Sequence, residues 1–220
     1  MLLAAGRGER MGELTEDRPK PLLSLGSETL IERQLRRLSR AGLREIVVNL
    51  SYFGGLMREM LGDGRRYGVQ IQYSDEGHPP LETAGGVARA LPLLGDEPFV
   101  LVNSDVVTDF DFARLTRIEL GPLSGSLVLV RNPSHHPIGD FGLDAEGRAT
   151  AGGERLTYAG IALLSPRLFA GLGDARAPLR PILDAAIDRG ELGALRHDGL
   201  WIDVGTPERL EAARNLPPGI

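Results

Sequence analysis

The chain has 220 residues and a formal net charge of −5, with 42% hydrophobic and 25% charged residues, a composition typical of one soluble globular domain. It contains no cysteine, which excludes disulfides, thiolate metal sites and a cysteine nucleophile. The scattered basic residues argue against a nucleic-acid partner, and the lack of a long apolar run or a basic leader argues against a membrane partner and predicts a cytoplasmic location.

The first part of the chain predicts alternating strands and helices. A capping box, Thr29-x-x-Glu32, opens a helix that ends at Gly42. Apolar runs predict strands at 2–5, 46–50, 69–73 and 99–103 and further helices at 53–61 and 83–93. Repeated strand–helix units of this kind predict an α/β fold with a Rossmann-like, mainly parallel sheet flanked by helices.

After about residue 120 the strands follow one another more directly. Apolar runs predict strands at 126–131, 141–143, 158–164, 194–197 and 200–204, with helices near 166, at 181–189 and from 207 onward. The last helix opens with Thr206 followed by Pro207. We expect a single domain over 1–220 that divides into halves of about 1–120 and 121–220, the second half being mixed and more antiparallel.

A glycine-rich loop follows the first strand. Gly6 and Gly8 let the backbone approach a phosphate, and Arg10 and Lys20, the only lysine of the chain, bring positive charge to the same place. The dinucleotide-binding fingerprint needs a third glycine where Met11 stands and a helix directly after it, whereas we expect no helix before about residue 29. The Gly-Lys-Ser/Thr of a P-loop does not occur either, so the sequence predicts a phosphate-binding loop of another kind.

This loop carries a family resemblance. It contains Leu-Ala-Ala-Gly-x-Gly-x-Arg-Met at 3–11 and Pro-Lys-Pro-Leu at 19–22, and the pair resembles the signature of the sugar-1-phosphate nucleotidylyltransferases. The resemblance implies an enzyme that joins a nucleoside monophosphate to a sugar 1-phosphate and releases pyrophosphate, with a nucleotide-binding first half and a sugar-binding second half. The residues implied to bind the nucleotide are Ala5, Gly6, Gly8, Glu9, Arg10, Lys20, Gly85 and Asn103. Those implied to be catalytic are Arg10, Lys20 and Asp105.

Two strand-end aspartates are expected to hold a metal ion. Asp105 follows the strand at 99–103, and Asp203 lies at the end of the strand at 200–204, where open α/β sheets bind ligands. The resemblance pairs them as ligands of one Mg²⁺, which prefers a few carboxylates together with phosphate oxygens and water. Taken singly, each aspartate could be a turn or helix-cap residue, and the two together with the loop motif favour the metal.

The resemblance assigns the sugar contacts to Asp140, Gly160 and Asp203. Asp140 would accept hydrogen bonds from sugar hydroxyls, and Gly160 would let the sugar lie against the backbone. The adjacent His135 and His136 lie in a proline-containing loop, and we interpret them as surface or packing residues. They are therefore left out of the predicted site.

The residues that contact the base and the acceptor phosphate are each open to two interpretations. Gly85 lies in a run of small residues whose backbone would meet the base, and Glu76 either accepts a hydrogen bond from a ring N–H or is a solvated loop carboxylate. Many family members carry a second lysine near the sugar phosphate, and this chain has none. Either Arg155 replaces it or the phosphate is held differently.

Within the family, the resemblance is strongest to the N-acetylmuramate-1-phosphate uridylyltransferases of bacterial cell-wall recycling. It is carried by Pro-Leu-Glu-Thr at 80–83, Leu-Val-Asn-x-Asp at 101–105, Asn-Pro-x-His-His followed by Gly-Asp-Phe at 132–141, and Val-Gly-Thr at 204–206. This resemblance covers nearly the whole chain and implies UTP and a sugar 1-phosphate as substrates and UDP-N-acetylmuramic acid as product. A mannose-1-phosphate guanylyltransferase is the alternative within the class, because the loop and metal motifs indicate triphosphate and metal binding and do not distinguish between sugars. A non-catalytic nucleotide-binding regulatory subunit is the alternative of another class. A nicotinamide-dependent oxidoreductase is disfavoured by Met11 and the delayed helix. No pattern predicts an oligomeric state.

Overall fold

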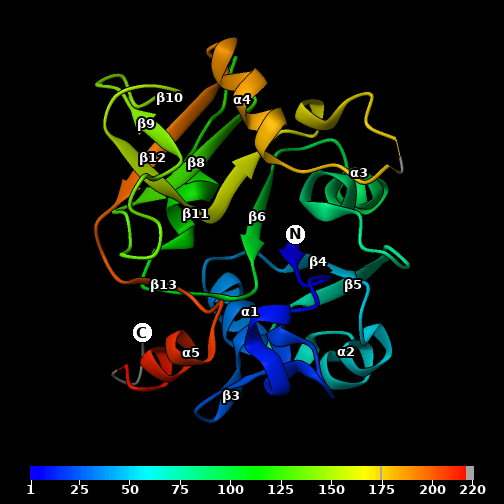
Figure 1. Ribbon diagram of the computed structural model, residues 1–220. Helices are drawn as coiled ribbons and strands as arrows, with labels where there is room; N and C mark the ends of the chain where they lie inside the picture. Colours follow the sequence, from blue (N-terminus) through cyan, green and yellow to red (C-terminus); the bar gives the residue numbers. More distant parts are fainter. Residues whose placement is uncertain (174, 217–220) are drawn as a thin grey trace. The chain divides into compact units, whose positions relative to one another are not determined.

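The computed structural model describes residues 1–173 and 175–216 (Figure 1). The chain forms two compact units. The first comprises 1–80, 103–113 and the segment from 200 onward, and the second comprises 81–102 and 114–199. The predicted halves on either side of residue 120 do not coincide with these units, because the chain returns to the first unit after each excursion into the second.

A parallel sheet organises the first unit. Its strands lie in the order β1 (Leu2–Leu3), β4 (Glu45–Leu50) and β5 (Gln70–Asp75). Leu2 pairs with Val48, and Val48 pairs with Tyr73. Between the strands the chain forms α1 (Leu30–Arg40) and α2 (Gly54–Leu61), as the alternating pattern predicts (Figure 1). The parallel order brings the carboxyl ends of all three strands to one edge.

The helix caps follow their sequence signals. The Thr29 hydroxyl accepts a hydrogen bond from the Glu32 amide at 3.4 Å, and the Glu32 carboxylate accepts one from the Thr29 amide at 2.8 Å, so the capping box opens α1 as predicted. Thr206 accepts a hydrogen bond from the Arg209 amide and caps α5 (Pro207–Arg214). Both signals are local, so the sequence is sufficient to find them.

The long loop after β1 differs from its prediction. We expected no helix before about residue 29, and the structure places 3₁₀ helices at Glu9–Thr15 and Lys20–Leu22, followed by a short hairpin of β2 (Ser24–Leu25) and β3 (Glu28–Thr29). Short 3₁₀ turns and two-residue strands are too short to show a periodic pattern of apolar residues, so the sequence does not predict them.

A core cluster of the first unit anchors this loop. Met11 is 1% exposed and packs with apolar side chains of the hairpin, the α5 region and the ribbon formed by β7 (Val106–Thr108) and β13 (Trp201–Asp203). The members of the cluster are Met11, Leu23, Leu25, Leu30, Val107, Val204, Leu210 and Ala213. The methionine that interrupts the dinucleotide fingerprint therefore ties the glycine-rich loop to the core.

The second unit contains a mixed sheet. Strand β11 (Arg155–Leu164) runs antiparallel to its partners, and β12 pairs in parallel with β8. The other strands of this sheet are β6 (Phe99–Asn103), β8 (Gly125–Val130), β9 (Phe141–Leu143), β10 (Ala149–Thr150) and β12 (Leu192–His197). Its helices are α3 (Glu82–Leu94) and α4 (Arg180–Asp188), visible in Figure 1.

The remaining elements are short. Additional 3₁₀ helices lie at Arg65–Tyr67, Phe112–Arg117 and Pro166–Phe169, so the helix expected near residue 166 is a 3₁₀ turn. The predicted α/β class, with parallel strands followed by mixed and antiparallel strands, is confirmed. Within the part of the chain that the structure describes, no helix combines the length and the apolar character that crossing a membrane requires.

Candidate active site

The predicted phosphate loop leaves the carboxyl end of β1 and folds back onto Lys20. Ala5 is buried, whereas Gly6 and Glu9 are exposed. Gly8 has a φ of 76°, and a Cβ at this position would lie 2.9 Å from the Cβ of Lys20. The loop backbone therefore rests directly against the lysine stem, which brings the predicted phosphate cradle and its cation together.

Lys20 and Asp105 form an ion pair between Nζ and Oδ2. Both side chains are largely buried, with 17% and 18% of their surface exposed. The Asp105 segment is tied to β1 by Ser104, whose amide and hydroxyl both donate to the Leu3 carbonyl, at 3.2 and 2.6 Å. Asn103 precedes this anchor as the last residue of β6. Two residues implied to be catalytic, 85 positions apart, thus meet at the carboxyl end of the first strand.

Asp203 lies beside Asp105 because their strands pair. In the antiparallel ribbon Asp203 is opposite Val106, and the Val204 amide donates to the Asp105 carbonyl at 2.9 Å. The Asp203 carboxylate accepts a hydrogen bond from Arg209 Nη1 at 2.7 Å. The two predicted metal ligands are therefore neighbours in the first unit, and each carboxylate faces a cation.

The residues of this ribbon fit a magnesium ion. Asp105 and Asp203 are neighbours through their backbones, and their carboxylates are hard oxygen ligands of the kind that Mg²⁺ takes, two being enough when phosphate oxygens and water complete the octahedron. No group of three or more His, Asp or Glu side chains suited to a metal occurs among residues 1–173 and 175–216. The pairing remains a prediction, and the geometry is compatible with it.

Glu76 is a buried carboxylate. It is 6% exposed at the end of β5 and accepts a hydrogen bond from Asn49 Nδ2 at 2.6 Å. The Oδ1 atom of the same Asn49 accepts one from the Ala4 amide at 2.7 Å, which also fixes the orientation of the amide group. The interpretation of Glu76 as a solvated loop carboxylate is therefore wrong. Asn49 links this carboxylate to the residue that precedes the glycine-rich loop.

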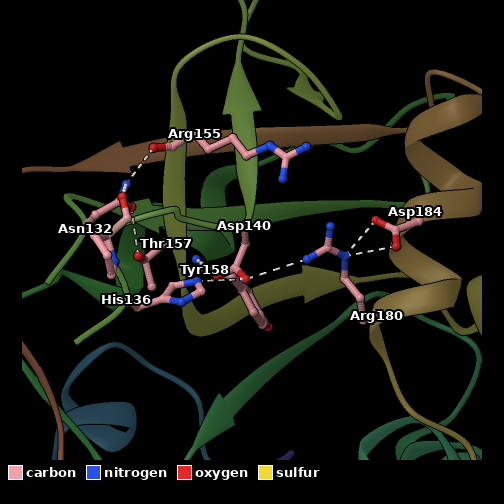
Figure 2. Close-up of polar contacts among 9 residues, drawn as sticks. Asn132, His136, Asp140, Arg155, Thr157, Tyr158, Arg180 and Asp184 are labelled. Atoms are coloured by element: carbon pink, nitrogen blue, oxygen red, sulfur yellow. Dashed lines mark hydrogen bonds and ion pairs between the residues drawn. The ribbon is translucent and has the colours of Figure 1, made fainter. Parts of the chain in front are cut away.

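Asp140 lies in the second unit and is surrounded by donors, as Figure 2 shows. Its Oδ2 accepts from the Tyr158 amide at 2.8 Å, its Oδ1 lies 3.2 Å from His136 Nε2, and Arg180 Nη1 lies 3.6 Å from the same oxygen. Arg180 also pairs with Asp184 at 2.8 Å and stacks over the ring of Phe141. His136, which was not predicted as a site residue, thus contacts Asp140, a residue predicted to bind the sugar.

The surroundings of Asp140 are fixed by burial and by the backbone. Burial, followed by the nearby Asp140 carboxylate, raises the pKa of the Tyr158 hydroxyl, which keeps that group neutral. Arg155 joins the cluster through its carbonyl, which accepts from Asn132 at 2.9 Å (Figure 2). Its guanidinium donates to the Ala151 carbonyl at 3.0 Å. The guanidinium that we considered as a replacement for the second lysine therefore has a backbone acceptor of its own.

The two remaining predicted residues are glycines of the second unit. The amides of Ala84 and Gly85 both donate to the Ala177 carbonyl, at 3.0 and 3.1 Å. A Cβ at Gly85 would lie 2.5 Å from the Ala175 carbonyl oxygen, so close backbone packing requires a glycine here without any ligand. Gly160 has a φ of 70° where β11 shifts register against β8. Base and sugar binding by these glycines remain predictions.

Three residues that contact predicted or possible site residues were not themselves predicted from the sequence. Arg209 follows its partner Asp203 by six positions across a turn, and no local motif marks such a pair. Asn49 was counted only as a strand residue, although a polar side chain within an apolar strand was a usable signal. His136 lies four positions before Asp140, and this spacing was the only clue to their contact.

The comparisons with known proteins show the family of the chain. Residues 1–142 match the model of the family described as nucleotidyl transferase. The chain is 47% identical to an N-acetylmuramate alpha-1-phosphate uridylyltransferase of Neisseria meningitidis, over 98% of this chain and 96% of the relative. It is 32% identical to the mannose-1-phosphate guanylyltransferase catalytic subunit beta of Danio rerio, over 94% of this chain and 61% of the relative.

A solved structure shows the same fold. The crystal structure of HddC from Yersinia pseudotuberculosis complexed with GMP-PN superposes with a TM-score of 0.78 at 20% identity, covering 97% of this chain and 96% of that one. The family match spans more than half of the chain and includes the glycine-rich loop, Lys20 and Asp105. The chain therefore belongs to the nucleotidyl transferase family and is a sugar-1-phosphate nucleotidylyltransferase.

Proposed function

We propose that the chain transfers UMP from UTP to N-acetylmuramate α-1-phosphate, forming UDP-N-acetylmuramic acid and pyrophosphate. The observation that carries this choice is the 47% identity to the uridylyltransferase of Neisseria meningitidis, which extends over nearly the full length of both chains. The guanylyltransferase relative is less similar, and this chain covers only 61% of it. Cell-wall recycling in the cytoplasm is the proposed setting.

The reaction we infer is a displacement at the α-phosphorus of UTP. A sugar-1-phosphate oxygen attacks, and pyrophosphate leaves in line without a covalent enzyme intermediate. Positioning and charge stabilisation supply most of the acceleration in such a reaction. The loop residues Gly6, Gly8 and Glu9 would hold the triphosphate, and Lys20 and Arg10 would bind its oxygens and offset the charge that develops in the transition state.

The acidic residues have a different role. Asp105 and Asp203 would hold Mg²⁺, which supplies Lewis-acid charge to the phosphate oxygens when bound. In the structure Lys20 occupies one oxygen of Asp105, and Arg209 occupies one oxygen of Asp203. Asp203 ends β13, and Asp105 directly precedes its partner strand β7 and accepts from the Val204 amide, which fixes the spacing between their backbones.

The other substrate parts are assigned to the remaining predicted residues. Asn103 and Gly85 would contact the nucleoside, with Glu76 as acceptor for the N–H of uracil. Asp140 and Gly160 would contact the sugar, where Asp140 is held in place by the Tyr158 amide. An ionised carboxylate that already accepts one backbone bond retains oxygen lone pairs for a sugar hydroxyl.

A turnover matrix tests the proposal. Purified protein is offered UTP or GTP with N-acetylmuramate 1-phosphate, N-acetylglucosamine 1-phosphate, glucose 1-phosphate or mannose 1-phosphate, and pyrophosphate release is measured. The proposal requires the highest kcat/KM for UTP with N-acetylmuramate 1-phosphate. Preference for GTP with mannose 1-phosphate establishes the guanylyltransferase instead. Nucleotide binding without pyrophosphate release in any combination establishes a non-catalytic subunit.

Asp105→Asn tests the acidic pair. We expect turnover to fall by at least about a thousandfold, because the variant loses one of two metal-binding carboxylates while the side chain keeps its shape. Circular dichroism should show an intact fold, although the unfolding midpoint falls because Lys20 loses its largely buried partner. Turnover measured well below that midpoint separates a catalytic from a folding defect. A folded variant with near wild-type turnover contradicts the metal assignment.

A further inference from the structure

Arg209 occupies an unusual place beside Gly205. Its Nη1 donates to Asp203, while its Nη2 lies within clashing distance of the position that a Cβ of residue 205 would take. Only a glycine can be placed at 205 without displacing this guanidinium. The side chain of Arg209 is 17% exposed, so it is held by its surroundings rather than mobile in solvent.

A second guanidinium reaches the same point. Arg10 Nη2 lies 3.1 Å from the Cβ position of Gly205, so the two Nη2 groups converge on one glycine from two different elements. Arg10 is exposed and makes no hydrogen bond or ion pair with any residue that the structure describes. Two like charges in such proximity repel each other, and a shared anion removes that cost.

We propose that Arg209 is a further phosphate-binding residue, forming with Arg10 a two-guanidinium clamp at Gly205 for a phosphate group of a bound substrate. The inference rests on the proposed function, which supplies the phosphorylated substrates. Planar guanidinium groups bind phosphate oxygens through two parallel hydrogen bonds, so arginine suits this role better than a point charge. The chain has one lysine, and a buried arginine is the group it offers near the acidic pair in place of a second one.

The pairing with Asp203 does not oppose this role. When Asp203 turns to a metal, Arg209 gives up its hydrogen bond to that carboxylate, and loss of a charged acceptor is unfavourable for a largely buried cation. A phosphate oxygen replaces the carboxylate oxygen as acceptor, so the charge of Arg209 stays compensated. A residue that served only to orient Asp203 would need no convergence with Arg10.

The phosphate has two sources, a nucleotide or a sugar 1-phosphate, and separate binding arms distinguish them. Isothermal titration calorimetry is run at saturating Mg²⁺ with pyrophosphate, with UTP, and with N-acetylmuramate 1-phosphate in the presence of a non-hydrolysable UTP analogue. The proteins compared are the full-length wild type, Arg209→Met, Arg209→Lys and Arg214→Met. Arg214 lies on the same helix α5, is partly exposed and pairs with Glu211, so its substitution controls for the loss of one positive charge.

We expect Arg209→Met to weaken one set of ligands about 10- to 100-fold, the range for a lost charge-assisted hydrogen bond. Loss for pyrophosphate and UTP assigns the clamp to the nucleotide, and loss for the sugar 1-phosphate alone assigns it to the acceptor. Arg209→Lys should recover part of the affinity, and Arg214→Met should change each affinity less than twofold. Arg209→Lys also keeps the comparison usable if the methionine variant does not fold.

Affinities for all three ligands within about twofold of wild type in a folded Arg209 variant overturn the inference. A change only in the Mg²⁺ concentration needed for binding overturns it as well, because Arg209 would then act through Asp203 alone. The pyrophosphate arm does not depend on base or sugar, so a failure of the proposed substrate choice in the turnover matrix leaves this test intact.

Discussion

Replacing Asn49 with leucine should destabilise the first unit strongly. Asn49 is 3% exposed and bridges the Ala4 amide and the Glu76 carboxylate at 2.7 and 2.6 Å. Leucine keeps the branched arrangement of heavy atoms, so the change opens no cavity and water does not enter to replace the lost partners. Its two methyl groups are larger than the amide oxygen and nitrogen, so strain from overpacking adds to the loss of the two hydrogen bonds.

The magnitude follows from the groups left behind. A buried donor or acceptor without a partner costs about 1–3 kcal/mol, and more when the group is charged. The Ala4 N–H loses its acceptor and Glu76 loses a donor, so we expect a loss of about 2–5 kcal/mol in the free energy of unfolding. That is a large share of the about 5–15 kcal/mol typical of a domain.

The assay can be confined to the correct unit. Trp201 is the only tryptophan of the chain and belongs to the first unit, so its fluorescence during urea denaturation follows that unit. Asn215→Leu, an exposed asparagine on the same unit, serves as matched control and should change stability by less than about 0.5 kcal/mol. If Asn49→Leu falls within that range too, the bridge contributes nothing and the reasoning is refuted.

Three further predictions test the site and its support. Asp140→Asn should raise KM for the sugar 1-phosphate at least about tenfold while leaving KM for UTP unchanged, because an amide offers one acceptor oxygen instead of two; equal effects on both substrates would contradict a sugar role. Met11→Ala should lower the free energy of unfolding by about 2–5 kcal/mol in urea titrations, since the side chain is 1% exposed. The same variant should weaken UTP binding, because the loop that carries Arg10 becomes less ordered. A loss of stability below about 1 kcal/mol would show that Met11 does not anchor the loop. Burial and the hydrogen bond to Glu32 raise the pKa of Tyr67 to about 12. The stabilisation is therefore present below the unfolded pKa of about 10 and is lost as pH rises toward 12. The stability difference between wild type and Tyr67→Phe should accordingly shrink over this interval, and a constant difference would exclude the linkage.

The parts of the fold that the sequence predicted well have long local signals. The strand at 99–103 agrees with β6 residue for residue, and the capping box at Thr29 opens α1 as expected. Both depend on contiguous residues, either an apolar run or a four-residue cap. The 3₁₀ helices of the loop and the ribbon strand β7 are too short for any period, so tertiary packing decides them.

The sequence indicates candidate site residues only where they lie in short motifs or at strand ends. Lys20 and Asp105 were selected separately, one from the loop motif and one from a strand end, and the structure joins them in an ion pair. Their contact depends on how Ser104 is anchored to β1, a long-range hydrogen bond that no sequence pattern encodes. The same reason explains the omission of Asn49, whose role depends on partners 45 and 27 positions away.

Charge pairing gives these separate observations a common logic. In the structure each predicted metal ligand forms an ion pair with a cation, Asp105 with Lys20 and Asp203 with Arg209, and all four side chains are mostly buried. Buried charges without partners are costly, so the acidic pair needs these cations as long as no metal is bound. Under the proposed function, a metal-bound triphosphate brings its own cation to the carboxylates and its own anions to Lys20 and Arg209. The carboxylates and the cations thus exchange partners, so every buried charge is paired both before and after the substrate binds. Substrate binding therefore does not include the free-energy cost of leaving a buried charge without a partner. Removing Lys20 or Arg209 should therefore destabilise both the free protein and the complex with metal and substrate. For this reason Arg209 variants must be judged on phosphate affinity at saturating metal rather than on turnover alone.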